Sequence, residues 1–238
     1  MFPSTAKLGF WAATLAAFVN LVFVACFIGN ALVNPLFTWT ALDSYVAYMR
    51  AHDRTLVTVA QACMLLMGPL FVVLVSCLHE VAPPERKTAV RAALALSVGF
   101  AVLTGINYWT QITAVRFNLA RGTTAGLEQF LQSKPDSAMA SINMLGWTMY
   151  FGLSSLLASM AFAPNAPKLE RAIRVALVAN GVCCLLAGGG FFIDNILLIF
   201  VTINLGMGAA ITTATILLAV FFGRVGELPA NSLTQAAR

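Results

Sequence analysis

Six stretches of the chain are apolar and contain no charged side chain. They cover residues 8–42, 55–78, 92–115, 137–167, 175–193 and 195–223, and every stretch between them carries charge. A helix needs about 20 predominantly apolar residues to cross the hydrocarbon core of a bilayer. The pattern therefore predicts about six transmembrane helices, at approximately 8–31, 55–78, 92–115, 138–162, 172–193 and 195–222.

The two long connections between these spans, residues 31–54 and 116–136, contain shorter periodic segments. Apolar side chains recur at helical spacing at Leu42, Tyr45, Val46 and Met49, and again at Leu127, Phe130 and Leu131. Such segments are typical of short amphipathic helices in the membrane interface. Trp39, Tyr45 and Tyr48 suit the interfacial aromatic belt, so we expect surface anchoring, with a lid over a ligand as the alternative. Asp136 or Ser137 is the expected N-cap of the fourth span.

Composition supports a membrane protein. Hydrophobic residues make up 60% of the chain and charged residues 10%, whereas roughly a quarter of a soluble domain is charged. The first apolar run is too long for the core of a signal peptide, so we expect an uncleaved first span. All five cysteines lie in apolar runs, where they act as small buried hydrophobes. We therefore expect one all-α, polytopic transmembrane domain over residues 1–238.

The basic residues indicate an orientation. With six spans, the side that holds the termini carries nine lysines and arginines and the other side carries five. Under the positive-inside rule, both termini are expected in the cytoplasm, in a bacterial cytoplasmic membrane, and the long connections lie on the outer side. Because the basic residues are dispersed over short loops, the positive net charge does not predict binding to nucleic acid.

Polar side chains within the spans gather in the outer half of the predicted bundle. A polar group at membrane depth has to face protein or a wet cavity. The candidate ligand-binding residues are Gln61, Asn107, Tyr108, Trp109, Gln111, Asn143, Trp147 and Asn204. Their amides and aromatic rings predict an outward-facing cavity for a neutral or lipid-like small molecule. In the alternative interpretation, the amides only join helix to helix, which contributes roughly 0.6 to 2 kcal/mol each.

Small residues suggest a second function. Gly152, Ser155 and Ser159, together with Gly181 and Gly188, form surfaces that permit close approach of helices. This pattern also suits an accessory or assembly subunit that binds another membrane protein, or a homo-oligomer.

Chemical motifs offer little support for an enzyme. The two histidines, His52 and His79, fall on opposite membrane faces, so they cannot share one metal ion or haem. The chain contains no nucleophile-elbow, zinc-protease or nucleotide-binding motif, so we expect no cofactor, no metal ion and no catalytic residues. A membrane enzyme with an outer-surface site is the third hypothesis. It would draw on polar residues of the outer connections, namely Asp43, His52, Asp53, Arg116, Arg121, Glu128 and Asp136.

Overall fold

The computed structural model describes residues 3–227, which are helical and contain no strand. The first half holds α1 (Pro3–Val33), α2 (Leu42–Ala51) and α3 (Thr55–Val81). It then continues through η1 (Pro84–Arg86), α4 (Lys87–Thr110), η2 (Gln111–Val115) and α5 (Arg116–Arg121). The last four of these elements follow one another without a break, so the third span is longer than predicted and runs from Pro84 to Arg121.

The second half begins with η3 (Leu127–Phe130), α6 (Ala138–Leu145), η4 (Gly146–Tyr150), α7 (Phe151–Ala158) and η5 (Ser159–Ala161). It ends with α8 (Lys168–Phe192), α9 (Ile196–Phe200), η6 (Val201–Met207) and α10 (Gly208–Glu227). The segments η2, η4 and η6 are π-helical and lie inside longer helices. The predicted all-α bundle is therefore confirmed.

Five helices are long and apolar enough to span a membrane, namely Ser4–Val33, Thr55–Val81, Pro84–Arg121, Lys168–Phe192 and Ile196–Gly226. The remaining predicted span forms a helical stretch from Ala138 to Ala161, but it is not among the five. Its buried side chains explain the difference, because they include Asn143, Thr148 and Ser154. Polar groups on the protein-facing side lower the mean hydropathy of a helix that neighbouring helices shield.

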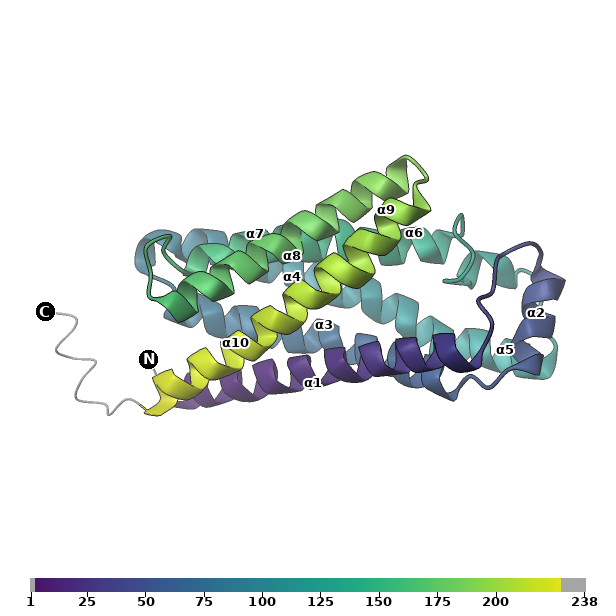
Figure 1. Cartoon of the computed structure of the whole chain (residues 1–238), viewed down its shortest axis with the longest axis horizontal. Helices are drawn as coiled ribbons and strands as arrows, with labels where there is room; N and C mark the ends of the chain where they lie inside the picture. The colour runs from purple at the N-terminus through teal and green to yellow at the C-terminus, as the bar shows by residue number, and fades with distance from the viewer. Residues whose placement is uncertain (1–2, 228–238) are drawn as a thin grey trace, which may run out of the picture.

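The helices form a closed ring in the order α1, α3, α4, α7, α8 and α10 (Figure 1), and each packs on the next. α10 returns to α1 and closes the ring near the described termini. There, a Cβ on Gly226 would lie 3.6 Å from that of Ala6. Both described ends thus lie at one end of the bundle, here termed the inner end. The opposite end, which carries α2, is termed the outer end.

The middle of the ring is filled by aromatic rings. Phe151 lies 4.7 Å from Phe71 and 4.5 Å from Phe100, measured between ring centroids. Trp147 packs edge-on against Phe100 at 4.8 Å. The rings of Phe71, Phe100 and Phe151 are almost completely buried, so this aromatic plug closes the ring toward the inner end.

The small residues of α7 and α8 are used inside the chain. A Cβ on Gly152 would lie 2.8 Å from the Cβ of Cys184, and one on Gly181 would lie 2.5 Å from Leu156 Cγ. Asn180 donates a 2.7 Å hydrogen bond to Ser155 Oγ across the same interface. This part of the small-residue surface is therefore covered by the packing of α7 on α8 within the chain.

The outer connections fold over the end of the ring. Tyr45 and Val46 of α2 are buried against Val115, Leu119 and Leu127. The amphipathic pattern of residues 42–49 does form a helix, α2. The amphipathic pattern of residues 127–131 forms a short 3₁₀ turn, η3.

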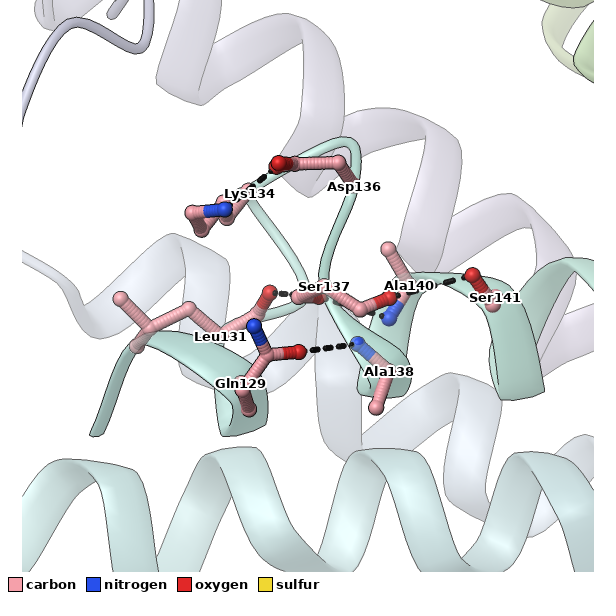
Figure 2. A network of polar contacts seen from close by, with 8 residues as sticks. All are labelled: Gln129, Leu131, Lys134, Asp136, Ser137, Ala138, Ala140 and Ser141. Atoms are coloured by element: carbon pink, nitrogen blue, oxygen red, sulfur yellow. Dashed lines mark hydrogen bonds and ion pairs between the residues drawn. The ribbon is translucent and has the colours of Figure 1, made fainter. Parts of the chain in front are cut away.

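A network of hydrogen bonds ties the second connection to the start of α6 (Figure 2). Ser137 is the N-cap, since its Oγ accepts from the Ala140 amide, and it also donates to the Leu131 carbonyl. Gln129 Oε1 accepts from the Ala138 amide. Lys134 lies 2.6 Å from the Asp136 carboxylate, and this contact lowers the pKa of Asp136. The N-cap predicted at Asp136 or Ser137 is thus Ser137.

Candidate functional site

A cavity of about 580 Å³ occupies the outer half of the ring, above the aromatic plug. Its walls come from α1, α3, the outer part of α4, the junction of α6 with η4, and the segment from Ile199 to Thr212. Trp147 lies at its inner boundary because it both lines the cavity and packs on Phe100. The volume falls within the range of roughly 300 to 1,000 Å³ that is usual for small-molecule sites.

Six of the eight predicted site residues line this cavity, namely Gln61, Tyr108, Gln111, Asn143, Trp147 and Asn204. The other two do not. Trp109 is 61% exposed on the outside of the bundle. Asn107 is fully buried, and its Nδ2 donates to Gln132 Oε1 at 3.0 Å. A π-helical segment begins just after these residues, and the helix directs neighbouring side chains to different faces.

Some of the amides join parts of the structure. Gln111 donates from Nε2 to the Phe130 carbonyl at 2.7 Å and accepts at Oε1 from the Gln132 amide at 3.2 Å. Together with the bond from Asn107 to Gln132, these contacts fix the second outer connection over the cavity. For these two side chains, the structure agrees with the interpretation that amides hold the fold together.

Asn143 is different. Its side chain is buried, with an exposed fraction of 8%, and it lies beside the Tyr108 hydroxyl. That hydroxyl accepts a 3.1 Å hydrogen bond from Trp147 Nε1. The Asn143 Oδ1 accepts no hydrogen bond from any described residue. The same is true of Asn107 Oδ1 and Asn180 Oδ1, but of these three residues only Asn143 lines the cavity. A buried acceptor without a partner costs about 1 to 3 kcal/mol, so the Asn143 Oδ1 is a strong candidate for contact with a ligand.

The three π-helical segments all contribute to the cavity. Gln111 belongs to η2, Trp147 to η4, and Asn204 to η6. A π-bulge adds a residue to a helical turn, re-aims the following side chains and disturbs the regular hydrogen bonds, and such bulges are frequent at functional sites. Each of the three turns amide or aromatic groups toward the same space.

Residues from outside the spans complete the cavity. Tyr48 and His52 at the end of α2, Asp53 and Arg54 before α3, and Gln132 in the second connection all line its outer part. The sequence does not reveal this role, because it follows from how the connections fold back over the ring. The periodic pattern of 42–49 was the only signal, and it allowed a lid as an alternative.

Two of these residues have shifted pKa values. Hydrogen bonds from the Thr55 amide and hydroxyl lower the pKa of Asp53, whose carboxylate caps the start of α3. Partial burial lowers the pKa of the Arg54 guanidinium. Since an arginine starts from a value far above neutral, Arg54 stays positively charged.

The outer-surface residues considered for an enzyme are largely engaged elsewhere. Asp53 caps α3, Asp136 pairs with Lys134, and Arg116 stacks on Phe117 at 5.0 Å. Within residues 3–227, no group of three or more histidine, cysteine, aspartate or glutamate side chains could hold a metal ion.

Comparisons of this chain with family models, with curated proteins and with solved structures gave no match. The structure shows an all-α helical protein with five helices long and apolar enough to span a membrane and a cavity in the outer half of its ring.

Proposed function

We propose that this protein binds, or moves within the membrane, a neutral or lipid-like small molecule that occupies the outer cavity. We place it in a bacterial cytoplasmic membrane with both termini in the cytoplasm, as the distribution of basic residues favours. The observation that carries the proposal is the Asn143 Oδ1, which is buried beside the cavity without a hydrogen-bond partner.

The lining suits an amphipathic ligand. Phe23, Phe27, Ile203 and Met207 offer apolar contact, whereas Gln61 and Asn143 offer amide groups. A few polar groups in a mostly apolar pocket fix the orientation of a ligand, and the apolar contact supplies most of the affinity. Gln61 makes no side-chain hydrogen bond with another described residue, so its amide is also open to a ligand.

The cavity can be filled by substitution at Gly208. A Cβ built on Gly208, which lines the cavity, would meet only the Ile203 carbonyl, at 3.7 Å. Gly208→Leu therefore places a side chain in the cavity without a backbone clash. Gly105 of α4 is the matched control, because a Cβ there has no neighbour within 4 Å and the residue does not line the cavity.

The test is native mass spectrometry of the wild type and both variants, extracted in mild detergent. We expect a small molecule retained by the wild type and by Gly105→Leu, and at least about tenfold less of it on Gly208→Leu, which corresponds to an overpacking cost of about 1.4 kcal/mol. Equal retention by all three proteins would place any ligand elsewhere. No retained molecule on the wild type, together with no stabilisation by added lipids, would refute the proposal.

A further inference from the structure

Arg54 is a half-buried cation at the outer boundary of the cavity. The ion pairs of the described residues are His79 with Glu80 and Lys134 with Asp136, and neither involves Arg54. Its guanidinium also donates no side-chain hydrogen bond among residues 3–227. A partly desolvated charge is costly unless an opposite charge or hydrogen-bond acceptors compensate it.

The groups around Arg54 leave it without a counter-ion. The Asp53 carboxylate is exposed and bonds to the Thr55 amide and hydroxyl, at 3.1 and 2.9 Å. His52 directs Nδ1 at the Tyr48 carbonyl, 2.9 Å away, and its ring lies on that of Tyr48. The Tyr48 hydroxyl donates to the Pro35 carbonyl at 2.9 Å. These groups bond elsewhere, and Arg54 lines the cavity without an ion pair or side-chain hydrogen bond among the described residues.

α1 contacts the last helix mainly through α10. α1 packs along α10 near the inner end, where Gly9 and Phe222 are in close contact, but it does not pack extensively on α9 or η6. α10 and α9 diverge from α1 toward the outer end (Figure 1). Phe27 of α1 and Asn204 of η6 both line the cavity on either side of this seam.

We propose that the ligand is an amphiphile with an apolar chain and an anionic head, and that Arg54 binds the head while the chain lies between α1, α3 and η6. This inference rests on the proposed function and names the ligand class. From Arg54 to Met64, α3 rises by about 15 Å, and both residues line the cavity, which leaves room for an extended chain beneath the head. An arginine matches carboxylate and phosphate heads because its planar fork donates two parallel hydrogen bonds.

The test compares two lipids that differ only in the anion. Lysophosphatidic acid and a monoacylglycerol with the same chain are titrated against the full-length protein in detergent, and dissociation constants are measured by native mass spectrometry. We expect the wild type to prefer lysophosphatidic acid by at least about tenfold, and Arg54→Gln to lose most of that preference. Arg50→Gln, which removes the same charge from an exposed residue that does not line the cavity, should keep it.

Binding of the monoacylglycerol to Arg54→Gln serves as the control that this variant is folded. The ratio of the two dissociation constants is compared between proteins, so that differences in how the two lipids partition into micelles cancel. A preference unchanged in Arg54→Gln, or lost equally in Arg50→Gln, would overturn the role of Arg54 while leaving the proposed function intact. Failure of both lipids to bind the wild type would overturn both proposals. Inorganic phosphate is also tested as a competitor of lysophosphatidic acid. If it displaces lysophosphatidic acid at millimolar concentration, the site recognises a free anion from water and the lipid assignment is overturned.

Discussion

At the scale of single residues, the amides of the spans divide into two kinds. Gln111 and Asn180 donate to partners in another segment, at Phe130 and Ser155 respectively, whereas the Asn143 side chain has no such bond. The Oδ1 atoms of Asn143 and Asn180 are both buried without a partner among the described residues, but only Asn143 lines the cavity. The sequence predicts that amides at this depth turn away from lipid, because unpaired polar groups are costly there. It does not predict which ones are paired, because the partners Phe130 and Gln132 belong to a connection whose path depends on the whole ring.

The two kinds respond differently to substitution by leucine, which has a similar size. We expect Asn143→Leu to leave the free energy of unfolding unchanged or to raise it, because it removes an acceptor that had no partner. Asn180→Leu also removes an unpaired acceptor, but it breaks the bond to the buried Ser155 hydroxyl and should lower the free energy of unfolding by about 1 to 2 kcal/mol. Denaturant titration of the purified proteins in micelles checks both values.

The same two variants should also differ in the amount of ligand that they bind. Asn143→Leu is expected to lose bound ligand, whereas Asn180→Leu should retain it, since Asn180 does not line the cavity. If Asn143→Leu instead destabilised the protein as much as Asn180→Leu does and retained its ligand, Asn143 would be a structural residue only.

At the scale of helices, the pattern of apolar residues predicts the approximate bounds of most long elements, and it misses their irregularities. The second, fourth and sixth predicted spans start within one residue of the observed helices, whereas the third helix starts eight residues before its predicted start, at Pro84. The π-helical turns at Gln111, Gly146 and Val201 have no comparable signal, because the local sequence continues the ordinary helical pattern.

The interface between α7 and α8 provides a test at this scale. Gly181→Ala puts a methyl group within 2.7 Å of the Gly152 carbonyl, so the two helices have to separate. We expect the free energy of unfolding to fall by about 1 to 3 kcal/mol. Gly189→Ala, on the same helix but with no neighbour within 4 Å, should leave stability unchanged or raise it by up to about 1 kcal/mol. An equal loss in both variants would contradict the close approach of these helices.

At the scale of the whole molecule, the ring places both described ends at the same end of the bundle. They meet where Ala6 faces Gly226, although the helix from Ala138 to Ala161 is not among the five that are long and apolar enough to span a membrane. The sequence nevertheless predicts six spans, because residues 137–167 contain no charged side chain and are long enough to cross a bilayer.

Reporter fusions decide the number of passes. Because six passes put both ends on one side, we expect green fluorescent protein to be fluorescent and alkaline phosphatase to be inactive at either terminus in a bacterial host. With five passes, the two termini would give opposite results. Phosphatase activity at both ends would preserve the even number and reverse the proposed orientation.

The packed rings of Phe71, Phe100 and Phe151 fill the ring of helices between the outer cavity and the inner end. If the cavity holds the proposed ligand, that molecule does not pass these rings while they keep this packing. Under the proposed function, exchange would then take place with the outer side alone. Flux across the bilayer would demand a second arrangement in which these three rings part.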